Sequence, residues 1–130
     1  MSMRTDDLYL VDIIESAQAV AAMIRGCDLP SFVGDDMLRS AVLWKLYVIS
    51  EAAGKLSGEL RELFTDVPWD QIRAFRNRLA HGYFTLQWDR VWHIAAQNTP
   101  TLRLQAEAIL AERFPQVFRQ LQDRRAHGSP

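Results

Sequence analysis

The helical spacing of its apolar residues is the feature that most constrains how this chain folds. The clearest stretch runs from about Asp35 to Lys55, where apolar residues recur every three or four positions. Because each helical residue turns by about 100°, this spacing collects them on one face. Such an apolar helix is typical of the centre of a bundle or of a surface covered by a partner. The face comprises Leu38, Ala41, Val42, Leu46, Ile49 and Ala53, and Trp44, Tyr47 and Val48 widen it.

Further segments carry the same spacing, and glycine and proline separate them. Thr5 is expected to cap the first helix and Gly26 to end it. Thr99-Pro100 marks either a kink or a fresh start with Thr99 as the cap. We expect helices over about 5–26, 35–55, 57–64, 69–81, from 88 or 89 to 114, and after 115, with a loop over 27–34 and a frayed tail over 124–130.

No segment shows strand alternation, and no repeat is found, so the predicted class is all-α, an antiparallel up-and-down helical bundle. A length of 130 residues fits one domain over 1–130. Its core is expected at about 5–112, with a short helix and frayed tail over 114–130. The single cysteine, Cys27, excludes an intrachain disulfide. The start lacks a signal-peptide pattern, and the apolar run at 41–49 is too short for a bilayer, so we expect a cytoplasmic protein without membrane contact.

The net charge is −1, so nucleic acid would have to be attracted by a local patch. The stretch 71–83 offers such a patch, because Arg73, Arg76, Arg78 and His81 stand there without any acidic residue. The same cluster also fits an ordinary solvated helix face, and spacing alone favours that interpretation.

Arg76 and His81 are the candidates for chemistry on phosphate. Arginine presents a planar fork that suits phosphate, and histidine moves protons near neutral pH. Five residues apart, they diverge by about 140° on a regular helix and cannot easily serve one phosphate in a monomer. Either the helix ends near His81-Gly82, or two copies form one site and supply both the base and the acid. Tyr83, seven residues after Arg76, falls on the face of Arg76.

Other chemistries are poorly supported, and we expect neither a metal nor a cofactor. The three histidines, His81, His93 and His127, are not spaced to share a metal on a helix. Cys27 has no adjacent histidine or basic cluster that would activate a thiolate, and no glycine-rich nucleotide motif occurs. The four tryptophans suit core or dimer contacts better than base stacking.

These residues match a known pattern, because Arg76, His81 and Tyr83 form an Arg-x4-His-x-Tyr motif with Asn77 after the arginine. The chain resembles HepT-like proteins, the HEPN-domain toxins of HEPN–MNT toxin–antitoxin pairs. The likeness covers roughly residues 5–112. It is also carried by Ile49-Ser50-Glu51-Ala52-Ala53, Val67-Pro68-Trp69 with Ile72, Val91-Trp92, and Pro100 with Leu102.

The resemblance implies a HEPN-like homodimer and a type VII toxin that cleaves RNA (tRNA or mRNA) without a metal. His81 would be the general acid/base and Arg76 would stabilise the phosphate, with Asn77, Tyr83 and Glu51 in support. The resemblance also implies an MNT-type nucleotidyltransferase antitoxin, which neutralises the toxin by transferring AMP to Tyr83. A phosphate beside Arg76 would occupy the RNA-phosphate site and repel RNA.

Several roles stay open at the level of sequence. Arg73 and Arg78 are either RNA-phosphate contacts or surface charges, and Glu51 is favoured as the partner of Arg73 or Arg76 over direct chemistry. Two departures from the family are Ser50 for a glycine and Gln87 for an aspartate. The alternatives are an inactive HEPN module that binds RNA or a nucleotidyltransferase, and a structural dimer whose polar cleft is vestigial.

Overall fold

The fold is entirely helical over the residues that the structure, a computed structural model, describes, namely 5–82 and 85–127. This confirms the predicted all-α class. None of the helices described is long and apolar enough to cross a lipid bilayer. The elements are α1 (Asp6–Met23), α2 (Leu29–Val33), α3 (Asp36–Lys55), α4 (Gly58–Leu63), α5 (Trp69–His81), α6 (Trp88–His93), the π-helical segment η2 (Ile94–Asn98), α7 (Thr99–Arg113) and α8 (Pro115–Ala126).

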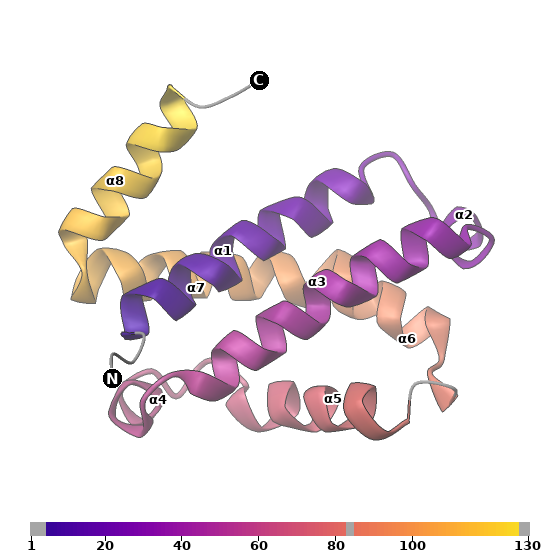
Figure 1. The fold of residues 1–130 in the computed structure, drawn as a ribbon, viewed down its shortest axis with the longest axis horizontal. Helices are drawn as coiled ribbons and strands as arrows, with labels where there is room; N and C mark the ends of the chain where they lie inside the picture. The colour runs from indigo at the N-terminus through magenta and orange to yellow at the C-terminus, as the bar shows by residue number, and fades with distance from the viewer. Residues whose placement is uncertain (1–4, 83–84, 128–130) are drawn as a thin grey trace.

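The long helices form the bundle that the sequence predicts (Figure 1). Helix α1 packs against both α3 and α7, and α5 packs against α3. Successive long helices run in opposite directions, and α8 turns away from the end of α7 (Figure 1). Helix α3 therefore contacts α1 in the core and also contacts α5. Helix α5 carries the Arg-x4-His part of the motif.

The core follows the apolar spacing of α1 and α3. Leu10, Ile13 and Ile14 on α1 are fully buried, as is Val42 on α3. Since about 25 cal/mol is gained for each Å² of apolar surface buried, these faces stabilise the bundle more than any single polar contact does. The exposed side of α3 remains available for other contacts.

Helix α2 lies where the sequence analysis placed a loop, so that expectation is wrong. Asp28 caps the helix, because its carboxylate accepts a hydrogen bond from the Ser31 N–H at 2.9 Å. Pro30 stands in the first turn, where proline fits. Phe32 is fully buried, with its ring 5.3 Å from that of Trp92, so tertiary packing stabilises a helix too short to form alone.

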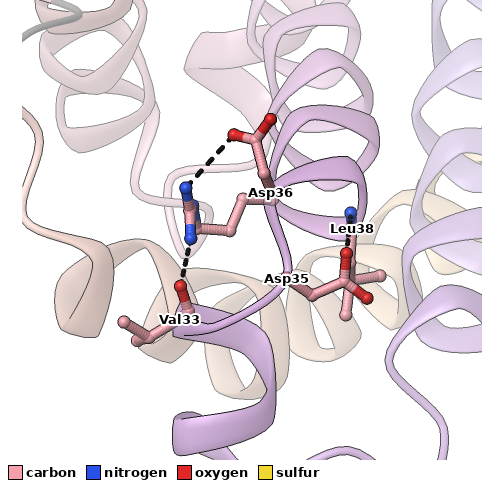
Figure 2. Close-up of polar contacts among 5 residues, drawn as sticks. Val33, Asp35, Asp36 and Leu38 are labelled. Atoms are coloured by element: carbon pink, nitrogen blue, oxygen red, sulfur yellow. Dashed lines mark hydrogen bonds and ion pairs between the residues drawn. The ribbon is translucent and has the colours of Figure 1, made fainter.

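The junction of α2 and α3 is fixed by polar contacts (Figure 2). Asp35 caps α3 by accepting from the Leu38 N–H at 3.0 Å. Arg39 donates to the Val33 carbonyl and, at 3.2 Å, to the Asp36 carboxylate. Its guanidinium carbon also lies 5.0 Å from the centre of the Trp88 ring. These contacts tie the start of α3 to both α2 and α6.

The Thr99-Pro100 step directly follows the π-helical turn η2 inside a continuous helix. Thr99 has helical backbone angles (φ −64°, ψ −44°), and its hydroxyl donates to the Ile94 carbonyl at 2.8 Å. Proline at position 100 has no N–H to donate, which accounts for the local change in hydrogen bonding. Of the two alternatives, a fresh start capped by Thr99 is therefore wrong.

The C-terminal helix is longer than expected. Residues 124–126, expected to be frayed, belong to α8, while 128–130 lie outside the described residues. Leu121 is only 2% exposed, and Arg125 contacts the Glu107 carboxylate at 2.7 Å. Arg124 lies 3.9 Å from Glu15. One buried side chain and two ion pairs thus fasten α8 to the bundle.

Candidate active site

Helix α5 carries the motif, and its ends lie where the sequence predicted them. It begins at Trp69 after Pro68 and ends at His81, with Gly82 as its cap residue. The Trp69 indole N–H donates to the Phe64 carbonyl at 2.9 Å, which fixes the first turn. Leu79 is buried, so the helix rests on the core. The polar side chains of α5 therefore lie on its two flanks, beside the face that is packed on the core.

Arg76 is held by Glu51 of α3. Its Nε donates to the Glu51 Oε1 at 2.6 Å, and the same oxygen accepts a hydrogen bond from the Tyr47 hydroxyl at 3.0 Å. The Arg76 side chain is 41% exposed and that of Glu51 is 25% exposed. No other hydrogen bond of Arg76 is found within the described residues, so its terminal nitrogens are free to bind an anion.

The ion pair sets the charge state of Glu51. The hydrogen bond from Arg76 is the main reason why the pKa of Glu51 lies below its usual value. Tyr47 and Lys55 lower it further, while partial burial acts against them. The hydrogen bond to Glu51 in turn raises the pKa of the Tyr47 hydroxyl. Glu51 is therefore an anion at neutral pH, suited to orienting Arg76 and not to donating a proton.

A cationic pocket of about 320 Å³ lies beside this ion pair. Four cations and one carboxylate, Glu51, line it, which gives it a formal charge of +3 in a chain whose net charge is −1. Asn77 lines it as well, so the structure brings four of the predicted site residues to one pocket, namely Glu51, Arg73, Arg76 and Asn77. The four cations are Lys55, Arg61, Arg73 and Arg76.

Arg78 is separated from this group. It lines a different hollow, of about 650 Å³, on the side of α5 that faces α6 and η2, together with Arg90 and His93. Arg73 and Arg78, the two predicted RNA contacts, therefore lie on opposite flanks of α5. One strand would have to wrap around the helix to reach both.

His81 does not meet Arg76 within the chain. It is the last residue of α5, is exposed, and is not among the residues that line the cationic pocket. The helix is continuous between the two, so their side chains diverge by about 140°. The helix does end at Gly82, as one alternative proposed, but His81 still lies outside the pocket that Arg76 lines. Tyr83 lies outside the described residues.

Three residues near the pair were missed in the sequence analysis. Tyr47 stands four residues before Glu51 and Lys55 stands four residues after it, so both lie on its side of α3. That spacing was the signal available for them. Arg61 gave no such signal, because only the turn between α3 and α4 brings it to the pocket.

An apolar stripe follows the exposed side of α3 and ends at Glu51. Met37 is 84% exposed and Trp44 is 61% exposed, and they precede Glu51 by two and one intervals of seven residues. The Trp44 ring stacks on Tyr47, with centroids 5.9 Å apart. Beside Trp44 lies a hollow of about 230 Å³, which Leu43 and Leu79 help to line. We call Met37, Trp44, Tyr47 and this hollow the α3 stripe.

Comparison with known families decides which group the chain falls into. Residues 13–109 match the family described as Ribonuclease HepT-like. The chain belongs to this family. The matched range holds Glu51, Arg76 and His81 and excludes α8, so the family likeness is carried by the bundle that forms the cationic pocket.

Relatives of this HepT-like chain come from archaea and bacteria. A Methanocaldococcus jannaschii protein named "Putative RNase MJ1380" is 33% identical over 84% of this chain and all of its own length. A Caldanaerobacter subterraneus protein named "Putative RNase TTE0752" is 32% identical over 83% of this chain and 96% of its own length. A Thermococcus cleftensis protein named "Probable ribonuclease HepT" is 26% identical over 73% and 86%. No solved structure matches the chain.

Proposed function

We propose that this HepT-like chain is an endoribonuclease that needs no metal and serves as the toxin of a toxin–antitoxin pair. The observation that carries the proposal is Arg76, held by Glu51 at the edge of a cationic pocket. A guanidinium fixed through Nε offers its terminal nitrogens to a phosphate, where it stabilises charge that builds up during cleavage. The ribonuclease names of its relatives support the same activity.

The proposed reaction uses the RNA's own 2′-hydroxyl. One His81 imidazole takes the hydroxyl proton as the oxygen attacks the adjacent phosphorus. The bond to the 5′-oxygen of the next nucleotide then breaks, and a second imidazole protonates that oxygen. The products are a 2′,3′-cyclic phosphate and a free 5′-hydroxyl. Arg76 stabilises the crowded phosphorane-like transition state, with Asn77 in support.

The two imidazoles come from two copies of the chain. The divergence of Arg76 and His81 leaves a single copy incomplete. The α3 stripe supplies a surface for the second copy, since it presents a protruding ring, Trp44, beside an apolar hollow. A two-fold interface needs such self-complementarity. Because the stripe ends at Glu51 and its hollow includes Leu79, pairing through it would bring both motifs to one cleft.

Control by a partner is the last part of the proposal. A nucleotidyltransferase antitoxin would join AMP to the Tyr83 hydroxyl, which attacks the α-phosphorus of ATP and releases pyrophosphate. Tyr83 follows His81 by two residues, so the attached phosphate would stand at the cleft and exclude RNA. Intact-mass measurement after coexpression with the antitoxin tests this. Added AMP that is lost in Tyr83→Phe supports the proposal, and an unmodified chain in a tight complex contradicts it.

The test of the activity is cleavage of RNA by the purified chain in EDTA. We expect 2′,3′-cyclic phosphate ends and a fall of about 10²- to 10⁴-fold in rate for His81→Ala. The matched control is His93→Ala, since His93 is also exposed but lines the hollow on the other flank of α5. Full activity in His81→Ala would refute the mechanism.

A second candidate is an inactive module that binds RNA or the antitoxin. It is favoured by the separation of His81 from the cationic pocket. It predicts RNA binding without cleavage, and binding that survives His81→Ala. The cleavage assay in EDTA therefore separates the two candidates directly.

A further inference from the structure

The cationic pocket extends beyond the motif on α5. Lys55 is in the last turn of α3 and Arg61 in the last turn of α4, and both line the pocket with Arg73. These residues come from three helices, so folding and not sequence proximity brings them together. Neither Lys55 nor Arg61 belongs to the Arg-x4-His-x-Tyr motif.

The turn that carries Lys55 and Arg61 is held in place. The Ser57 hydroxyl caps α4 by accepting from the Leu60 N–H at 3.2 Å. Asp6 of α1 accepts from the Ser57 N–H at 2.9 Å and from its hydroxyl at 2.6 Å. The backbone from which the two cations extend is thus fixed on both sides of the turn.

The charge of the pocket is not balanced by the protein. Over residues 5–82 and 85–127, no ion pair or hydrogen bond to another side chain is found for Lys55, Arg61 or Arg73. Glu51 is engaged by Arg76. Arg61 is only partly exposed, so its guanidinium is not simply a surface charge surrounded by water. Four cations grouped around the single carboxylate of Glu51 repel one another, and an anion in the pocket would relieve that repulsion.

We propose that Lys55 and Arg61, with Arg73, bind the RNA phosphate that neighbours the one being cleaved. The inference rests on the proposed function, which assigns the cleaved phosphate to Arg76. A strand with that phosphate on Arg76 extends toward the turn between α3 and α4, where these cations lie. Trp69 and Ile72 form an apolar wall for the attached nucleoside, and the Trp69 ring is fixed by its bond to the Phe64 carbonyl.

We call Lys55, Arg61 and Arg73 the neighbouring-phosphate subsite. Loss of this subsite should change the kinetics differently from loss of Arg76. Contacts to a neighbouring phosphate hold the strand equally in the ground state and in the transition state, so their loss raises KM and leaves kcat unchanged. They carry no base preference and weaken with salt. A dinucleotide, which has only the cleaved phosphate, does not reach the subsite.

A structural role makes the opposite prediction. Cations in the last turn of a helix interact favourably with the helix dipole, which is worth a few tenths of a kcal/mol to about 1 kcal/mol. If that were all Lys55 and Arg61 did, their removal would lower thermal stability and leave KM for RNA unchanged. Melting temperature and KM, measured on the same variants, separate the two roles.

The experiment compares Lys55→Ala/Arg61→Ala with wild type on a dinucleotide and on a ten-nucleotide RNA, in EDTA. Arg119→Ala is the control, because Arg119 is an exposed cation on the distant α8. We expect KM for the long RNA to rise about tenfold in the double variant, with kcat and dinucleotide cleavage unchanged. The slope of log Kd against log salt should fall by about 0.7 for the lost phosphate contact.

Binding of a 2′-O-methyl RNA of the same length, followed by fluorescence anisotropy, keeps the subsite testable without cleavage. If wild type cleaves RNA but the double variant keeps its KM, the subsite is wrong and the ribonuclease stands. If nothing is cleaved but the double variant binds the 2′-O-methyl RNA more weakly, the subsite stands and the ribonuclease is wrong. Equally tight binding of AMP or inorganic phosphate overturns the assignment to RNA, as does an equal loss in Arg119→Ala.

Discussion

Arg76 donates to Glu51 through Nε at 2.6 Å, so one edge of the guanidinium is occupied by the protein and the terminal nitrogens are not. This is an orienting contact between α5 and α3, and it explains how a half-exposed arginine can have a defined position. Glu51 acts through Arg76 in this arrangement and has no assigned contact with RNA. Its substitution should therefore affect the rate through the placement of Arg76.

The first prediction concerns Glu51→Ala and Glu51→Gln. A hydrogen bond to a charged group is worth about 1.5–3 kcal/mol, so we expect kcat to fall about 10- to 100-fold in Glu51→Ala, with little change in KM. Glutamine keeps an acceptor for the Arg76 Nε and should restore part of the rate. Steady-state kinetics on a defined RNA measure both. Unchanged kcat in Glu51→Ala would show that Arg76 needs no support.

The second prediction is a pH dependence of stability that belongs to Glu51. The pKa of Glu51 in the folded chain lies below the value of 4.5 that it has without partners, chiefly because of Arg76. At pH values between the lowered pKa and about 4.5, Glu51 binds more protons in the unfolded chain than in the folded chain. The stabilisation is therefore complete above about pH 4.5 and is lost as the pH falls through the lowered pKa.

Urea denaturation of wild type and Glu51→Gln at several pH values measures this effect. The difference in their free energies of unfolding should narrow as the pH falls from about 6 to about 3, since glutamine does not titrate. The other carboxylates are common to both chains and cancel in the comparison. A constant difference across that range would contradict a coupled Glu51–Arg76 pair.

The third prediction tests the α3 stripe as the dimer surface. Trp44→Glu places a charge on that stripe and should convert dimers to monomers in light scattering after size exclusion, with loss of RNA cleavage. Leu104→Glu is the matched control, because Leu104 on α7 is 66% exposed and Trp44 is 61% exposed. If both variants stay dimeric, the second copy binds elsewhere.

The fourth prediction asks whether one cleft uses both His81 side chains. Wild type and His81→Ala are mixed in equal amounts and allowed to exchange subunits. If cleavage needs two imidazoles, only dimers of two wild-type chains are active, which leaves about a quarter of the activity of an all-wild-type sample. If about half of the activity remained, each copy would work alone and the shared site would be wrong.

The helices were predictable because local signals agreed with the packing. The bounds of α3 follow from its apolar spacing, and those of α5 follow from Pro68 and Gly82 at its two ends. Helix α2 was missed because its five residues show no periodicity, and burial of Phe32 was needed to stabilise it. Tertiary packing therefore determines whether α2 forms, and no local sequence pattern predicted it.

The candidate site was predictable only in part, for a similar reason. Spacing on one helix identified Arg76 and His81 and showed that they diverge. Arg73 and Arg78 have the same five-residue spacing and also diverge by about 140°. The sequence did not show that this divergence places them in two different hollows, on opposite flanks of α5. Arg61 joins the pocket through the turn between α3 and α4, which no periodicity on α5 encodes.

The fifth prediction concerns Gln87, where related chains were expected to carry aspartate. Gln87 occupies the N-cap position of α6, and its side chain makes no capping hydrogen bond. Glutamine is too long to reach back to the first N–H groups, whereas aspartate is among the preferred caps. Gln87→Asp should therefore raise stability by about 1 kcal/mol, which corresponds to about 3–5 °C in melting temperature.

Calorimetry at one fixed protein concentration measures this change, because dimerisation makes the melting temperature depend on concentration. Gln87→Ala is the control, since alanine removes the side chain without supplying a cap, and it should leave the melting temperature nearly unchanged. An equal rise in both variants would mean that the glutamine side chain is unfavourable in itself. No rise in Gln87→Asp would mean that the first N–H groups of α6 are already satisfied, and that the start of α6 does not limit the stability of the bundle.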